Sequence, residues 1–175
     1  MRIVLATPLY PPDTAPQARY VKELAERLRK EHEVTIVAYA HIPEAVSGVR
    51  IVAVDKIKPI PIRLTLYTLA LYRALRSADL VYAVNGPSVE LPLFLLSFMR
   101  MSLVFGVVDS SAHERMKENF FTRLVHRTVR RHAHAVVTAM PPERPEILPF
   151  AAPPDTTAYE QAWKTHLADT FTYGT

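Results

Sequence analysis

The N-terminal stretch, residues 1–39, constrains the fold more than any other part of the chain. Residues 3–6 form an apolar run that is too short for a helix and is followed by prolines, which indicates a buried strand. From Gln17 onward, apolar residues recur at intervals of three and four, as in an amphipathic helix. A second β-rich run covers residues 34–39. Strand, helix and strand at this spacing predict a βαβ unit with parallel strands and a right-handed crossover. The apolar face of the expected helix consists of Tyr20, Val21, Leu24, Ala25 and Leu28.

The rest of the chain continues this alternation of strands and helices. The pattern predicts an α/β fold with a single Rossmann-like, doubly wound, mainly parallel sheet and helices on both faces. We expect Ser88 to cap its helix, with Glu90 in the first turn. The expected further strands are residues 49–54, 79–84, 103–108 and 135–138, and the expected further helices are residues 64–75, 88–101, 119–134 and 159–171.

Length limits the domain organisation. A chain of 175 residues that is 49% hydrophobic can bury one good core but not two ordinary ones. We expect one domain over residues 1–150. Six prolines fall within residues 141–154, which is typical of a linker. Residues 151–175 are therefore expected to form a Pro-rich linker and a C-terminal helix that packs back on the domain.

The composition limits the cellular compartments in which we expect the protein. The chain has no cysteine, which excludes disulfides and thiolate metal sites and fits a reducing compartment. We find no pattern of a signal peptide and no apolar window long enough to span a membrane. We therefore expect a cytoplasmic location, with peripheral contact at the inner membrane face as a further expectation. The net charge of +4 fits either ordinary solubility or attraction to an anionic membrane or phosphate-bearing substrate.

Three loops follow predicted strands at their carboxyl ends, namely residues 7–17, 85–88 and 109–114. Ligands of open parallel sheets bind outside these ends, so we expect the functional site here. The candidate contact residues in the first two loops and at the start of the first helix are Pro8, Tyr10, Asp13, Gln17, Asn85 and Gly86.

The order strand, TPLYPPD, short loop and YVKELAERLRKEHEVTIV resembles the N-terminal domain of GT-B glycosyltransferases of the retaining family four, and the resemblance extends to about Pro149. GT-B enzymes place two Rossmann-like domains across a cleft, whereas this chain has room for one. The resemblance implies the acceptor-binding half of a transferase that moves a sugar from a nucleotide-sugar to a glycan or lipid-linked acceptor. It implies no cofactor, and it assigns the six loop residues to the acceptor and donor cleft. The family's Glu-x7-Glu pair belongs to the donor domain, so it has no counterpart here.

The chain departs from the family pattern in two loops. Relatives carry a glycine pair after the first strand, where the backbone approaches donor phosphates, but here residues 13–16 are Asp-Thr-Ala-Pro. Gln17 or Arg19 could contact the donor instead, or could simply face solvent. After the fifth strand, Val108 occupies the place of a histidine that lines the active site in relatives. The resemblance then leaves Asp109 and His113 as the candidate catalytic residues, although His113 could equally be an exposed loop histidine.

A basic stripe on the expected helix 119–134 is the second candidate for function. The four arginines lie near Phe120 and Phe121, and basic amphipathic helices bind anionic membranes by charge attraction and shallow burial. A solvated outer face, with the apolar side on the sheet, is the alternative. The stripe consists of Arg123, Arg127, Arg130 and Arg131.

Other chemistries fit the sequence poorly. His132 and His134 are two apart and do not face each other on a helix, so we expect no metal site. The hydrolase motif G-x-S-x-G is missing, and no nucleic-acid-binding motif accompanies the basic residues. A flavodoxin-like or response-regulator-like module is a different class of fold, but the response regulator needs an acidic cluster after the first strand, where this chain has Thr7-Pro8-Leu9.

Two interpretations of the resemblance stay open. The chain could work with a separate donor-binding subunit, as in the split eukaryotic transferase of dolichol-linked sugar synthesis, or pair with a second copy. It could instead be a non-catalytic binding or regulatory domain that lost donor binding. A fragment of a longer gene product is a further expectation. Whether the chain is an active enzyme by itself is left undecided by these patterns.

Overall fold

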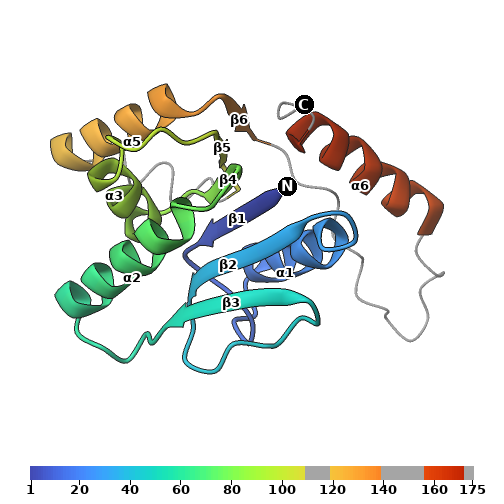
Figure 1. Ribbon diagram of the computed structural model, residues 1–175, viewed down its shortest axis with the longest axis horizontal. Coiled ribbons are helices and arrows are strands. Elements are labelled where there is room, and N and C mark those ends of the chain that lie inside the picture. The colour runs from blue at the N-terminus through green and yellow to red at the C-terminus, as the bar shows by residue number, and fades with distance from the viewer. Residues whose placement is uncertain (109–118, 139–155, 172–175) are drawn as a thin grey trace. The chain divides into compact units, whose positions relative to one another are not determined.

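A computed structural model describes residues 1–108, 119–138 and 156–171. Their contacts divide the chain into two units, Met1–Thr138 and Ala139–Thr175. The first unit is built on a six-stranded sheet in the order β3-β2-β1-β4-β5-β6, and every strand pair is parallel (Figure 1). The fold class expected from the sequence is therefore confirmed. The strands are β1 (Arg2–Thr7), β2 (Glu33–Tyr39), β3 (Val49–Val54), β4 (Leu80–Val84), β5 (Leu103–Gly106) and β6 (Ala135–Val137).

Helices cover both faces of the sheet. Helix α1 (Pro16–Leu28) packs on one face and buries Tyr20, Val21, Leu24, Ala25 and Leu28, the residues that the periodicity selected. The other face carries α2 (Ile60–Leu75), α3 (Pro87–Leu95) and α5 (Phe120–His132), which share one apolar core with the strands. The βαβ unit at the N-terminus is thus confirmed.

Strand order creates a switch point between β1 and β4. From β1 the chain proceeds outward to β2 and β3, and it then crosses back to β4, which pairs with the opposite side of β1. The loops after β1 and β4 therefore leave the same edge of the sheet in opposite directions. Open α/β sheets bind ligands at such a point.

Several element ends differ from the sequence-based expectation. Helix α2 begins at Ile60 rather than at Leu64, because prolines are tolerated in the first turn of a helix, where no intrahelical donor is needed. Helix α3 ends at Leu95, and β5 ends at Gly106.

The cap of α3 was predicted wrongly. Gly86, not Ser88, is the N-cap residue, and it offers no capping side chain. The carboxylate of Glu90 takes over this role, because its Oε1 accepts a hydrogen bond from the Gly86 N–H at 3.2 Å. A donor that the helix leaves unpaired is thereby satisfied from within the first turn.

The second unit contains one described helix, α6 (Thr156–Phe171), in which Trp163 and His166 meet edge to face with ring centroids 5.7 Å apart. The expected domain limits and the packing of this helix on the domain stay predictions, and the proline-rich segment lies outside the described residues. No described helix is long and apolar enough to cross a membrane.

Candidate functional site

The loops after β1 and β4 touch at the switch point. A Cβ built on Gly86 would lie 3.1 Å from Cγ of Pro8, which is closer than ordinary van der Waals contact. Gly86 also has a φ of 156°, which L-residues rarely adopt. Glycine is therefore required at position 86 for the two loops to approach each other.

Two stacked tyrosines fix the sheet edge below these loops. The rings of Tyr39 and Tyr67 are nearly parallel, with centroids 4.3 Å apart. The Tyr67 hydroxyl lies 3.1 Å from the Val37 carbonyl oxygen and 3.4 Å from that of Thr7, while the Tyr39 hydroxyl donates to the Ser88 carbonyl at 3.0 Å. The ends of β1 and β2 and the start of α3 are thus tied together.

Basic side chains from the β3–α2 connection and from the start of α2 border the same edge. The ammonium of Lys56 pairs with the carboxylate of Asp13, and the guanidinium of Arg63 lies 5.5 Å from the ring centroid of Tyr39. Arg63 also donates to the Lys56 carbonyl at 3.2 Å. Arginine and lysine bind phosphate and carboxylate groups through charge-assisted hydrogen bonds, so this corner could accept an anion.

The sequence analysis missed Lys56 and Arg63. Lys56 follows the end of β3 by two residues, so the rule that parallel strands end at one edge could have identified it.

A buried acid and histidine lie behind the β4–α3 loop. Glu90 is fully buried, and its Oε2 lies 2.8 Å from Nδ1 of His126 on α5. The His126 ring contacts Phe105 edge to face at 5.7 Å between centroids. Since a carboxylate can only accept hydrogen bonds, Nδ1 is the donor when Glu90 is ionised. The pair links α3, α5 and the loop at Gly86.

The structure places the six predicted cleft residues around this edge, with different exposures. Pro8, Asp13 and Gln17 are half-buried, whereas Tyr10, Asn85 and Gly86 are buried. The Asn85 Oδ1 accepts a hydrogen bond from the Val108 N–H at 2.8 Å, which joins the end of β4 to the residues after β5. Their ligand contacts stay predictions. Asp109 and His113 lie outside the described residues.

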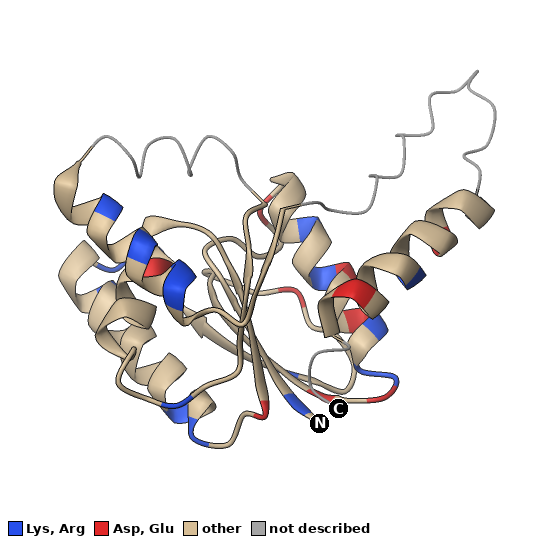
Figure 2. Ribbon diagram, turned by 90° about the horizontal axis from the view of Figure 1, so that it is seen from above, with Lys and Arg blue, Asp and Glu red and all other residues tan. Residues whose placement is uncertain are grey.

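Helix α5 exposes both its arginines and its first apolar residues. Phe120, Phe121 and Leu124 are 80%, 56% and 43% exposed, so these three side chains do not follow the alternative in which the apolar side lies on the sheet. The buried residues are instead Val125, His126 and Val129, because they follow the spacing that faces β5 and α3. Basic positions recur along this helix (Figure 2). All four arginines are exposed, namely Arg123, Arg127, Arg130 and Arg131.

Comparison with known structures supports the fold. HepE from Anabaena, in complex with UDP and glucose, matches with 18% identity and a TM-score of 0.52 over 93% of this chain and 41% of HepE. The HepE complex with UDP-glucose gives 18% identity and 0.52 over 93% and 40%. MurG from Acinetobacter baumannii matches at 14% identity and 0.48 over 87% and 44%. The chain thus spans about two fifths of the length of HepE.

Among curated proteins, no significant match to this chain is found. Residues 17–159 match the family model described as the glycosyl transferase 4-like domain, which covers most of the chain, including the loop after β4. The chain therefore belongs to the glycosyl transferase 4-like domain family.

Proposed function

We propose that the chain is the acceptor-binding half of a GT-B glycosyltransferase and that a separate donor-binding domain completes it. The observation that carries this proposal is the carboxyl edge at the β1–β4 switch point, where the contact of Pro8 with Gly86 shapes the loops and the Lys56–Asp13 pair and the Arg63 guanidinium supply charged groups. The chain's coverage of about two fifths of HepE agrees with a half of such an enzyme.

We assign the donor to the other half of such an enzyme. HepE is in complex with UDP in one structure and with UDP-glucose in another. This chain covers only 41% and 40% of the HepE chain in these structures. In this chain, residues 13–16 lack glycine, and Pro16 starts α1 without an amide donor. A side-chain Cβ in that loop keeps the backbone away from a diphosphate. We therefore expect this domain to bind an acceptor and to have little affinity for the nucleotide-sugar by itself.

The acceptor is proposed to be a glycan or lipid-linked sugar presented at a membrane surface. Helix α5 combines exposed Phe120 and Phe121 with the exposed arginine stripe. Aromatic side chains insert at the headgroup level while arginines attract anionic lipids, which would hold the domain at the inner face of the membrane.

Calorimetric titration of the purified chain tests the proposal that this domain binds the acceptor and not the nucleotide-sugar. We expect no heat from UDP, GDP or their sugar conjugates at millimolar concentration, but binding of a short glycan or glycolipid acceptor. The variant Lys56→Gln should weaken acceptor binding about tenfold, because a charge-assisted hydrogen bond is lost. Lys58→Gln, which removes the same charge from an exposed position of the same connection, is the matched control.

Two results would contradict the proposal. Micromolar affinity for a nucleotide-sugar would show that the donor site is complete within this chain. Equal weakening by Lys56→Gln and Lys58→Gln would show that the sheet edge is not the acceptor site.

A non-catalytic binding or regulatory role is the second candidate. The replacement of the glycine pair by Asp-Thr-Ala-Pro favours it, because these residues remove donor contact without disturbing the sheet. A donor-binding partner chain that restores sugar transfer when mixed with this chain would decide against this role.

A further inference from the structure

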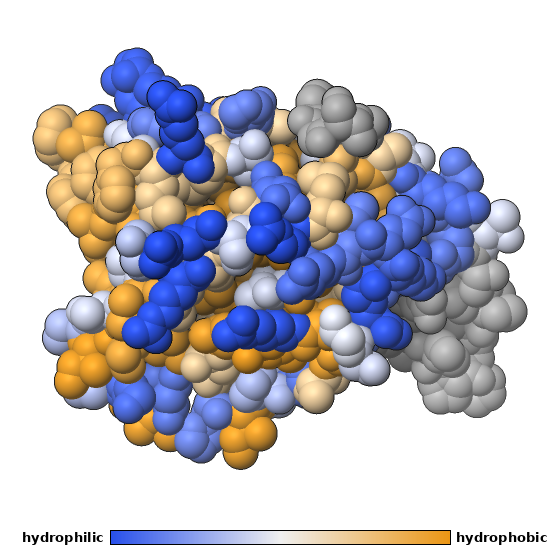
Figure 3. Space-filling view, viewed as in Figure 1, coloured by the Kyte–Doolittle hydropathy of each residue, from blue (hydrophilic) through white to orange (hydrophobic). Residues whose placement is uncertain are grey.

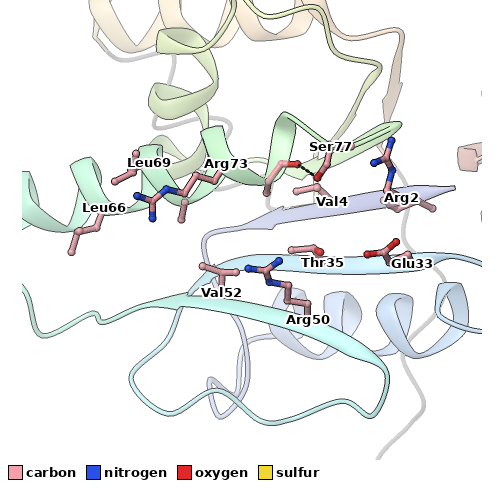
Figure 4. A pocket seen from close by; sticks show the side chains of 14 residues that line it. Arg2, Val4, Glu33, Thr35, Arg50, Val52, Leu66, Leu69, Arg73 and Ser77 are labelled. Carbon is pink, nitrogen blue, oxygen red and sulfur yellow. Dashed lines mark hydrogen bonds between the residues drawn. The ribbon is translucent and has the colours of Figure 1, made fainter.

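A pocket lies at the edge of the sheet opposite the switch-point loops. It has a volume of about 250 Å³ and is enclosed between α2 and the amino-terminal halves of β1, β2 and β3 (Figure 4). Its floor includes Val4, Thr35 and Val52. The switch-point loops lie at the carboxyl ends of these strands, so this pocket is separate from the proposed acceptor site.

The residues of α2 explain why the space is open. This helix fills the core with Tyr67, Leu71 and Leu75, whereas the side that borders the pocket carries Ala70 and Ala74. Small side chains leave room that larger ones would fill, and the strand residues opposite them become polar at the same level. The register across the sheet runs from Val4 through Thr35 to Arg50.

Two arginines border this space from opposite walls. Arg50 comes from β3 and Arg73 from α2, and both guanidinium groups lie at the same end of the pocket, with Arg2 and Glu33 at the other end (Figure 4). Arg2 pairs with Asp79 at 3.1 Å. Within the described part of the chain, neither Arg50 nor Arg73 has an acidic partner. The end of the pocket that they border is therefore positive.

An aliphatic stripe on α2 leads to these arginines. Ile62, Leu66 and Leu69 precede Arg73 at intervals of four, three and four residues, which places all four side chains along one face of the helix. The three aliphatic side chains are 51%, 38% and 42% exposed. Apolar surface is visible between hydrophilic side chains on the face shown in Figure 3.

We propose that this pocket binds an anionic amphiphile with a phosphate head and an alkyl chain. The head would lie between Arg50 and Arg73, because two guanidinium groups on opposite walls can contact different oxygens of one tetrahedral phosphate. The chain would lie along Leu69, Leu66 and Ile62, where its burial removes exposed apolar surface from water. This site goes beyond the proposed transferase half and does not depend on it.

Titration with three probes tests the proposal. Dodecyl phosphate below its critical micelle concentration carries head and chain together, inorganic phosphate carries the head alone, and dodecyl maltoside carries the same chain on a neutral head. We expect dodecyl phosphate to bind at least about tenfold more tightly than either of the others, because only it makes both the charged and the apolar contacts.

Variants locate the binding. Arg50→Gln and Arg73→Gln together should weaken dodecyl phosphate binding by about a hundredfold, or about tenfold for each charged contact. Ala74→Leu, which fills the pocket without changing charge, should also weaken it. Arg76→Gln is the matched control, because Arg76 is exposed at the end of the same helix but does not line the pocket.

The outcomes separate the sources of the ligand. Equal binding of inorganic phosphate would overturn the amphiphile assignment, and unchanged binding by both the double variant and Ala74→Leu would overturn the site. A loss with Arg76→Gln as large as that with the double variant would also overturn it, since general charge attraction would then account for the binding.

Discussion

Nδ1 of His126 on α5 lies 2.8 Å from Oε2 of the fully buried Glu90 on α3. The other carboxylate oxygen of Glu90 accepts the Gly86 N–H at 3.2 Å. One buried carboxylate therefore connects the two helices to the loop that contacts Pro8. A buried carboxylate without hydrogen-bond partners would destabilise the fold, so Glu90 needs both the His126 and the Gly86 contacts.

Removal of the Glu90 carboxylate should destabilise the domain strongly. We expect Glu90→Ala to lower the free energy of unfolding by about 3 kcal/mol, because it leaves His126 and the Gly86 N–H without their acceptor. Urea unfolding measures the change. In a double-mutant cycle with His126→Ala, the two losses should not add, since both variants remove the same contact. Simple additivity would show that the two side chains are independent.

Gly106 leaves no room for a side chain beside Tyr82. A Cβ at this position would lie 2.8 Å from Cζ of Tyr82, a buried ring whose hydroxyl is 2.8 Å from that of Tyr20. We expect Gly106→Ala to cost about 1–3 kcal/mol of unfolding free energy through overpacking. Gly106→Ala combined with Tyr82→Phe should recover part of the loss. An alanine variant with the original melting temperature would contradict this packing.

Tyr10 should make the domain sensitive to alkaline pH. Burial and the nearby carboxylates of Glu26 and Glu44 raise the pKa of Tyr10 to about 12. An unfolded tyrosine ionises near pH 10, so its contribution to stability is complete below that pH and is lost as the pH rises from about 10 to about 12. Urea unfolding at pH 8 and in steps above pH 10 should show this decline.

The variant Tyr10→Phe should remove only part of that decline, because burial also raises the pKa values of other tyrosines, namely Tyr20, Tyr39, Tyr67 and Tyr82. At neutral pH it should leave stability unchanged or raise it by about 1 kcal/mol, because the buried hydroxyl has no hydrogen-bond partner within the described residues. Tyr67→Phe is the contrasting variant, since it removes the hydrogen bond to the Val37 carbonyl and should destabilise. A marked loss of stability at neutral pH in Tyr10→Phe would show that its hydroxyl is bonded after all.

The C-terminal helix is predicted to pack on the sheet domain. Tyr159, Trp163, His166 and Thr170 recur at intervals of four, three and four residues, which places them on one face of α6. Trp163 is the single tryptophan of the chain, so its fluorescence reports on this face alone. We expect blue-shifted emission and, for Trp163→Ala, a melting temperature lower by about 10 °C.

Lys164→Ala, the neighbouring substitution on another side of the helix, serves as the control for that experiment. Removal of residues 156–175 should also lower the melting temperature. A shortened chain with the same melting temperature as the full-length chain would contradict the packing of α6.

Local patterns were sufficient for the sheet and its first helix. The burial of Tyr20, Val21 and Leu24 follows directly from the helical period, and β3 has the bounds that its β-rich run predicted. The end of α3 was less predictable, because its apolar residues continue past Leu95 and periodicity cannot mark an end inside such a run.

By itself, the sequence determined the βαβ start, the alternation of elements and hence the parallel sheet, because hydrophobic period and turn residues act over a few neighbouring positions. Only the tertiary structure decided which side chains meet. Asp13 pairs with Lys56, Glu90 with His126, and Arg50 borders the same pocket as Arg73. These partners are far apart in the sequence, and strand order with helix packing sets their distances, which no local pattern encodes.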